Sequence, residues 1–77
     1  MGDIYLIKDL SRMSGFSIYT IKYYLKLGLI NETGRFPETN YRYFDNKTLG
    51  LLQEIHQLRK EKKPLSQIKE IIAGGDS

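Results

Sequence analysis

The sequence predicts a small, mainly α-helical domain: a winged helix-turn-helix with about four helices and a short β-hairpin wing. Three observations lead to this prediction. Residues 17–30 form a short amphipathic segment that carries both a start signal and an end signal of a helix. A second short helical segment and a glycine-containing break precede it, which is the typical pattern of a helix-turn-helix. A loop-forming stretch between two β-prone runs follows at residues 31–44 and indicates a hairpin.

The first of the two helical segments lies near the N-terminus. We expect a very short strand over residues 3–6 and a small helix over residues 7–14, in which apolar side chains recur on one face: Ile7, Leu10 and Met13. The pair Ser14-Gly15 ends this helix, because serine and glycine favour turns. Phe16 is the residue that we expect to be buried in the turn.

The second helix begins after Ser17, whose hydroxyl can accept a hydrogen bond from a free N–H group of the first turn. Gly28 suits the position after the last turn, where the backbone often becomes left-handed, and Leu29 can then fold back on Tyr24. At about 100° per residue, one face of this helix is an apolar stripe of Ile18, Ile21 and Leu25. Tyr23 points roughly opposite to the stripe, while Lys22 and Tyr24 lie on its two flanks.

The wing is predicted from two β-prone runs, Leu29-Ile30 and residues 41–44, around a polar loop. Side chains alternate along a strand, so Tyr41 and Tyr43 point one way and Arg42 the other. We expect Tyr41 and Phe44 to pack against the core. Arg42 then projects outward, where its guanidinium group can bind a phosphate with two hydrogen bonds.

Two further helices are predicted in the second half. Asp45 is the expected N-cap of the third helix, whose wide apolar face includes residues 49–58, and Gly50 inside it costs ~1 kcal/mol relative to alanine. This helix ends in the basic run 59–63. Pro64 then separates it from a last amphipathic helix that carries Leu65, Ile68, Ile71 and Ile72. We expect one domain over residues 1–73 and a flexible tail over residues 74–77.

Length, composition and charge narrow the class of function. The 77 residues make one domain at most, and the absence of cysteine excludes disulfides and thiolate metal sites. No catalytic set of residues is present, and the single histidine, His56, lacks partners at metal-ligand spacing, so we expect neither an enzyme nor a bound cofactor. Without a membrane-spanning run or a secretion signal, the expected location is the cytoplasm.

The net charge of +3 is a mild bias towards polyanions, and its distribution points to DNA. A helix fits the major groove of B-DNA with its leading turn at the base edges. The candidate base readers are therefore Ser17, Tyr19 and Thr20. The candidate phosphate contacts are Lys22, Tyr23 and Tyr24 on the helix, Arg42 and more weakly Arg35 on the wing, and Lys60 in the basic run. The alternative is that the tyrosines pack at the edge of a small core and the lysines are merely solvated.

A family resemblance rests on motifs spread from about residue 4 to residue 73. They include Gly15-Phe16-Ser17, residues 20–24, Gly28-Leu29-Ile30, residues 40–43 and Pro64-Leu65. Together they resemble the DNA-binding domain of the MerR family of bacterial transcription regulators, and within it most the multidrug-binding members. The resemblance implies that the second helix enters the major groove of double-stranded DNA and that the wing grips the flanking backbone. Family members usually have arginine where this chain has Lys22, and lysine keeps the charge without the planar fork.

The resemblance also implies partners. Family regulators bind as dimers to inverted repeats in a promoter with an overlong spacer, and they act on RNA polymerase indirectly by distorting that spacer. The family's long dimerisation helix and effector-binding part have no counterpart here, so we expect a homodimer only if such a helix is present. Two alternatives stay open: an excisionase-like architectural factor in recombination, and a protein-interaction module that uses the apolar face of residues 49–58.

Overall fold

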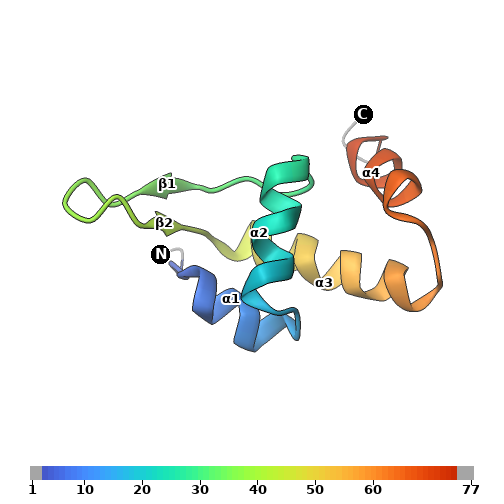
Figure 1. Ribbon diagram of the computed structural model, residues 1–77, viewed down its shortest axis with the longest axis horizontal. Coiled ribbons are helices and arrows are strands. Elements are labelled where there is room, and N and C mark those ends of the chain that lie inside the picture. The colour runs from blue at the N-terminus through green and yellow to red at the C-terminus, as the bar shows by residue number, and fades with distance from the viewer. Residues whose placement is uncertain (1–2, 75–77) are drawn as a thin grey trace.

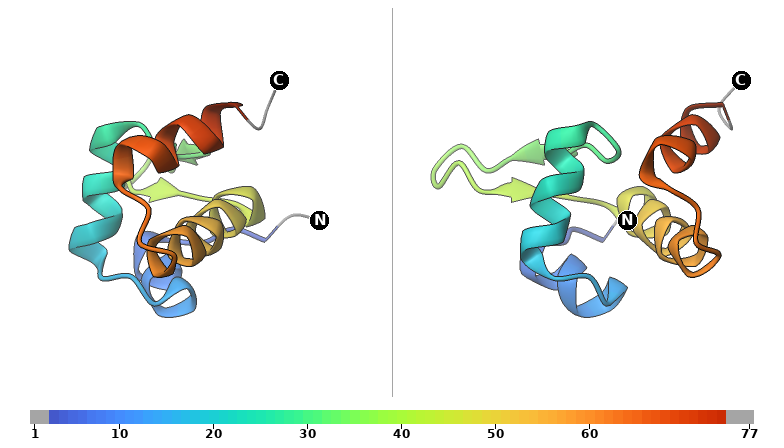
Figure 2. Two further views of the ribbon diagram at one scale, coloured as in Figure 1. Left: turned by 90° about the vertical axis from the view of Figure 1, so that its right-hand side faces the viewer. Right: turned by 45° about the vertical axis from the view of Figure 1, so that its right-hand side comes forward.

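Four helices and a two-stranded hairpin make up the computed structural model, which describes residues 3–74. This confirms the predicted fold class. In chain order the elements are α1 (Ile7–Ser14), α2 (Ile18–Leu27), β1 (Gly34–Arg35), β2 (Arg42–Tyr43), α3 (Asn46–Lys60) and α4 (Leu65–Gly74). The hairpin projects from one side of α2, and α4 lies on the other side, above the end of α3 (Figures 1 and 2). Gly74, the first residue of the predicted tail, is the last residue of α4, and the other residues of that tail, 75–77, lie outside the described part of the chain.

Helix α1 has the predicted bounds, but its buried face is turned relative to the prediction. Leu10 is fully buried and Ser14, four residues later, is also buried, whereas Met13 is 44% exposed. The expectation for Met13 is wrong because the core lies on the side of the helix that Ser14 occupies, about one helical turn from Leu10. In the following turn Phe16 is half-buried and packs edge-on against the ring of Tyr24, with 5.4 Å between ring centroids.

Helix α2 begins and ends as predicted. The Ser17 hydroxyl accepts a hydrogen bond from the Thr20 N–H (3.1 Å), and Gly28 is left-handed with φ of 79°. The N–H of Leu29 donates to the Tyr24 carbonyl (3.0 Å), a backbone bond that closes the end of the helix.

The buried face of α2 differs from the predicted stripe. Ile21 is fully buried and Tyr24 is 4% exposed, while Ile18 is 40% exposed. The aromatic contact between Tyr24 and Phe16 turns the buried face towards Tyr24 and leaves Ile18 at its edge. The predicted stripe was therefore correct for Ile21 and wrong for Ile18.

The wing is an antiparallel pair in which Gly34 faces Tyr43 and Arg35 faces Arg42. The prediction of Leu29-Ile30 as the first strand is wrong, because the first strand is Gly34–Arg35, while Leu29 and Ile30 lie in a bend that is buried in the core. Tyr43 explains why a glycine forms part of a strand. A Cβ atom at Gly34 would lie 2.6 Å from Cζ of the Tyr43 ring, so only glycine leaves room for the ring.

Phe44 and Tyr41 have opposite outcomes. Phe44 is fully buried, as predicted, but Tyr41 is 64% exposed, so the prediction that it packs against the core is wrong. Tyr41 follows Asn40, which is left-handed with φ of 61° at the end of the hairpin loop, and lies at the exposed end of the wing. Phe44 instead lies at the base of the wing, where its N–H and carbonyl both bond to Tyr5, at 2.8 Å each. This single bridge is all that forms of the strand predicted over residues 3–6.

Helix α3 begins at the predicted cap, since the Asp45 carboxylate accepts hydrogen bonds from the N–H groups of Lys47 and Thr48. Its apolar face lies inside the domain, with Leu52 and Ile55 fully buried and Leu49 8% exposed. Ile68 of α4 completes this core. The apolar face of residues 49–58 is thus largely occupied within the chain. Within residues 3–74 no helix is long and apolar enough to cross a membrane.

Candidate nucleic-acid interface

The leading turn of α2 presents three polar side chains, as predicted. Tyr19 is the most exposed of them, with 84% of its surface accessible. The hydroxyl of Ser17 donates to the Thr20 hydroxyl oxygen (2.9 Å) and also caps the helix, so the turn holds it in place. The Thr20 hydroxyl accepts that bond and keeps its own proton for another acceptor. Tyr19 and Thr20 are therefore freer to contact a ligand than Ser17 is.

The two tyrosines in the middle of α2 have different surroundings. Tyr23 is 48% exposed, whereas the ring of Tyr24 belongs to the core. The prediction that Tyr24 lies on a surface flank is wrong for its ring, because the ring packs on Phe16. Burial raises the pKa of the Tyr24 hydroxyl. Every fully buried side-chain oxygen of the described residues has a hydrogen-bond partner. The Tyr24 hydroxyl has no hydrogen-bond partner among the described residues, so this oxygen is not fully buried and is the part of the side chain that reaches solvent.

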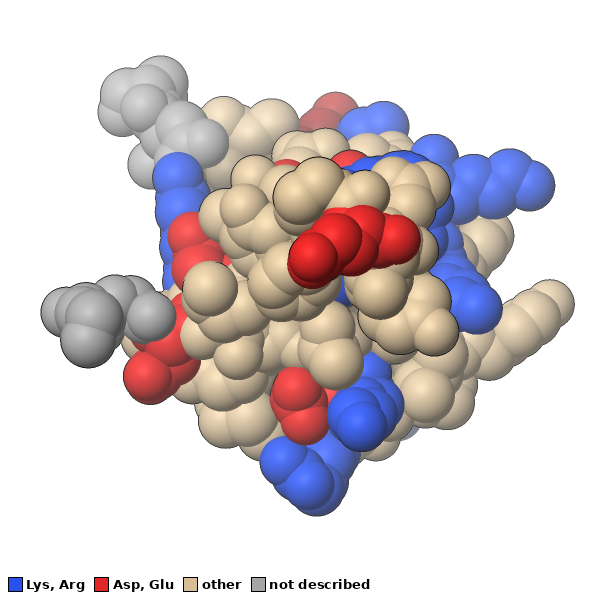
Figure 3. Space-filling model, turned by 90° about the vertical axis from the view of Figure 1, so that its left-hand side faces the viewer, with Lys and Arg blue, Asp and Glu red and all other residues tan. Residues whose placement is uncertain are grey.

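The fold brings Lys22 of α2 next to Arg42 of the wing. The two side chains line the same open hollow between α2 and the hairpin, together with Lys26 and Glu32. They also line a second hollow between the wing and the start of α1, to which Lys8 contributes. From the side of the wing, Lys and Arg side chains gather mainly along the right-hand flank and the lower edge of the surface, with a narrower strip beside acidic side chains on the left flank (Figure 3). Further acidic side chains lie near the centre of this view. Residues far apart in the sequence thus form one basic surface.

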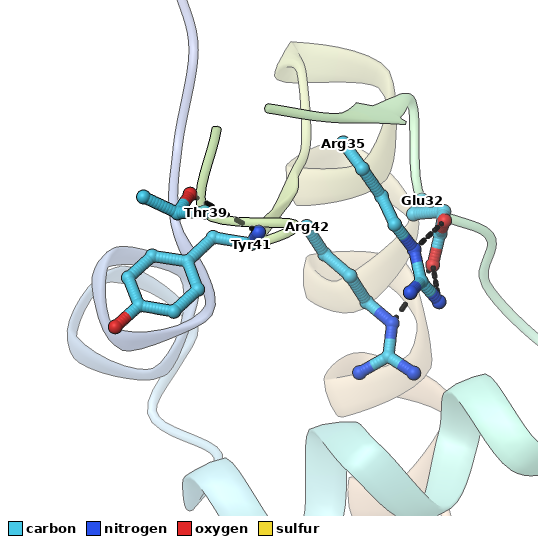
Figure 4. A network of polar contacts seen from close by, with 5 residues as sticks. All are labelled: Glu32, Arg35, Thr39, Tyr41 and Arg42. Carbon is cyan, nitrogen blue, oxygen red and sulfur yellow. Dashed lines mark hydrogen bonds and ion pairs between the residues drawn. The ribbon is translucent and has the colours of Figure 1, made fainter. Parts of the chain in front are cut away.

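Glu32 holds the two wing arginines. One oxygen of its carboxylate is 2.7 Å from Nε of Arg35, and the other is 2.8 Å from Nε of Arg42 (Figure 4). A third contact joins Glu32 to a terminal nitrogen of Arg35 at 3.3 Å. Hydrogen bonds from Arg35, and then from Arg42, hold the pKa of the Glu32 carboxyl below its usual value, and the same carboxylate raises the pKa of Arg35. Both wing arginines are therefore paired with a carboxylate of the chain itself.

Lys60 lies apart from the other candidates. It is the last residue of α3, and that end of the helix points away from the wing (Figure 1). It is exposed and lines neither of the two basic hollows. The structure thus brings Lys22, Arg35 and Arg42 together but not Lys60 with them.

Two basic residues of this surface were not among the predicted contacts. Lys26 could have been found, because it follows Lys22 by four residues and so lies on the same side of the helix. Nothing near Lys8 in the sequence indicates that it belongs to this surface. It joins the surface only because the wing lies beside the start of α1. His56 is half-buried and packs against Phe16 with 5.1 Å between ring centroids, so its ring has a packing role. Among residues 3–74 no group of His, Cys, Asp or Glu side chains could hold a metal ion.

Comparison with curated proteins relates this chain to two regulators of Bacillus subtilis (strain 168). The HTH-type transcriptional regulator CueR is 35% identical over 69 residues, which make up 90% of this chain and 47% of that protein. The multidrug-efflux transporter 1 regulator is 32% identical over 66 residues, or 86% of this chain and 24% of that protein. The chain therefore spans about half or less of the length of these relatives.

Solved structures show the same arrangement of elements. A MerR family transcriptional regulator from Bacillus cereus superposes with a TM-score of 0.86 at 22% identity, over 92% of this chain and 52% of that one. HiNmlR, described as a MerR family regulator lacking the sensor domain and bound to promoter DNA, gives a TM-score of 0.84 at 29% identity, over 95% and 55% of the two chains. The family described as MerR HTH family regulatory proteins matches residues 5–75. This chain belongs to the MerR family of helix-turn-helix regulatory proteins.

Proposed function

We propose that this chain binds promoter DNA, with α2 in the major groove and the wing on the adjacent backbone. The observation that carries the proposal is the shared surface of Lys22 and Arg42, next to the exposed leading turn of α2. In this proposal Tyr19 and Thr20 meet base edges, and Lys22, Tyr23 and Arg42 bind phosphates. The promoter complex of HiNmlR, a structure of 0.84 TM-score to this chain, supports the same use of the fold.

We propose further that two copies of the chain bind an inverted repeat as a dimer, in the cytoplasm. One α2 helix reads only a half-site, so a second copy is needed for a full operator. We propose that polymerase is affected indirectly, through the shape of the promoter. The apolar face of α3 is largely occupied within the chain, which argues against a protein-interaction module there. No observation favours a role in recombination over one at a promoter.

The test is a salt titration of binding to a labelled DNA duplex. The duplex comes from a selection in which this chain enriches sequences from a random pool. Each phosphate contact should add about one unit to the slope of log affinity against log salt concentration. Arg42→Ala should lower both the affinity and this slope. Tyr23→Phe should lower the affinity if its hydroxyl binds a phosphate, and circular dichroism of both variants should be unchanged.

Two results would contradict the proposal. One is a selection that enriches no sequence, together with an affinity that does not depend on salt. The other is full binding by a protein that carries both Lys22→Ala and Arg42→Ala. Either result would mean that the basic surface between α2 and the wing does not contact DNA.

A further inference from the structure

The wing contains an arrangement that should be unfavourable. Arg35 and Arg42 are direct partners across the hairpin, so two positive charges face each other in register. Like charges in this position destabilise a strand pair. Glu32 lies just before β1 and places one carboxylate oxygen on the Nε–H of each arginine, at 2.7 Å and 2.8 Å. One negative charge thus joins two guanidinium groups that would otherwise repel each other.

We propose that Glu32 is a positioning residue of the wing, which fixes Arg42 so that its terminal nitrogens face a DNA phosphate. This inference rests on the proposed function. The two arginines differ in what Glu32 leaves free. Arg35 uses Nε and one terminal nitrogen on the carboxylate. Arg42 uses only Nε, so both of its terminal nitrogens have no partner among the described residues.

The direction of the free nitrogens supports this role. Figure 4 shows the terminal nitrogens of Arg42 on the side of its guanidinium group that points away from Glu32. Arg42 also lines the hollow that contains Lys22 and Lys26. Its two unpaired terminal nitrogens therefore share a surface with two further cations. A guanidinium group held at Nε loses less side-chain freedom when it binds a phosphate. Arg42, rather than Arg35, is then the phosphate contact of the wing.

Charge alone predicts the opposite effect of Glu32. An acidic residue on a DNA-facing surface repels phosphate, so its removal should tighten binding if charge were all that mattered. The positioning role predicts that its removal weakens binding. This opposition in sign makes the two explanations separable in one experiment.

The experiment compares Glu32→Gln with Glu38→Gln in the salt titration described above. Glu38 is the matched control, because it lies in the loop of the same hairpin, is exposed, and has no hydrogen bond or ion pair with another described residue. Both variants remove one negative charge. Glu38→Gln should bind DNA as well as the original chain or slightly better, and Glu32→Gln should bind about tenfold more weakly, the effect of one oriented charged hydrogen bond.

Two further variants test the mechanism. Glu32→Asp keeps the charge but is too short by one methylene group to hold both arginines, so it should also weaken binding. In an Arg42→Ala background, Glu32→Gln should cause no further loss, because the side chain that it positions is gone. Equal or tighter binding by Glu32→Gln than by Glu38→Gln would overturn the inference, and so would a full loss in the Arg42→Ala background.

A measurement without DNA separates this inference from the proposed function. In nuclear magnetic resonance spectra of the free chain, the Nε–H signals of Arg35 and Arg42 should be shifted and protected from exchange, and both features should disappear in Glu32→Gln. If the original chain does not bind DNA but these signals are present, the proposed function is wrong and the positioning of the arginines still holds. If the signals are absent, the positioning role itself is wrong.

Discussion

The phenol ring of Tyr43 lies directly over Gly34, its partner on the neighbouring strand of the wing. A Cβ atom added to Gly34 would lie 2.6 Å from Cζ and 3.1 Å from Cε2 of the ring. The ring also contacts Phe36, with 4.9 Å between centroids. These contacts join the two strands on one face of the hairpin, and they depend on the absence of a side chain at Gly34.

Gly34→Ala should therefore weaken the wing. The new methyl group must displace the Tyr43 ring from Phe36, and forced repacking of this kind costs ~1–3 kcal/mol. Urea unfolding measures the change in stability, and loss of the nuclear Overhauser contacts between Phe36 and Tyr43 would locate it. Unchanged contacts would show that the ring does not depend on Gly34.

Gly50→Ala makes the same chemical change at a position with the opposite prediction. Gly50 lies inside α3, and a Cβ atom there would meet nothing within 4 Å. Alanine has a higher helix propensity and loses less conformational entropy on folding, so the free energy of unfolding should rise by about 0.5–1 kcal/mol. A decrease in the free energy of unfolding would mean that the helix is distorted at this part of α3.

Two isoleucines of α2 test the position of its buried face. Ile21 is fully buried and Ile18 is 40% exposed. Ile21→Ala should lower the free energy of unfolding by ~2–5 kcal/mol, and Ile18→Ala should cost well under half of that, because little apolar surface is lost from the core. Equal losses in urea unfolding would restore the face predicted from periodicity.

These isoleucines also show how far the sequence can predict the fold. Local signals were sufficient for the caps at Ser17, Gly28 and Asp45, because each depends on the chemistry of one residue and its close neighbours. The direction of a helix face depends on what packs against it. Helical spacing alone could not choose between Ile18 and Tyr24, since Phe16 decides the choice through a tertiary contact.

Lys8 is expected to contribute to DNA binding, although nothing near it in the sequence indicates this. It lines the hollow shared by Lys22 and Arg42. Lys8→Gln should weaken binding to all duplexes about equally and reduce the salt slope by about one unit. Lys47→Gln in the first turn of α3 is the control, because Lys47 lines neither basic hollow. Equal effects of the two substitutions would show only a dependence on net charge.

The arrangement of the candidate site was thus predictable in part. The exposed positions of Lys22 and Tyr23 on α2 followed from the helical period, which is local information. The position of Arg42 beside Lys22 depends on how the wing returns to α2, and that path is set by the buried side chains of Leu29, Ile30 and Phe44. The ion pairs of Glu32 were not predictable, because the first strand begins five residues later than the apolar pattern suggested.

The order of the wing should depend on pH through Glu32. Its pKa is lowered by the two arginines, so the charged form stabilises the folded hairpin. This contribution is complete above the ordinary pKa of a glutamate, and it is lost as the pH falls through the lower folded-state value. The Nε–H signals of Arg35 and Arg42 should follow this titration, and Glu32→Gln should abolish it. A signal that titrates unchanged in Glu32→Gln would assign the effect to another group.

The bridge between Tyr5 and Phe44 determines how the wing can move. Two backbone hydrogen bonds of 2.8 Å join these residues, and the Tyr5 hydroxyl donates to the Asn46 side chain at 2.7 Å. The base of the hairpin is therefore attached to the chain just before α1 as well as to α3. A change in the angle between wing and α2 must either break these bonds or carry the first turn of α1 along. Since α1 is itself packed against α2 and α3, these bonds should hold the base of the wing at a fixed angle to α2.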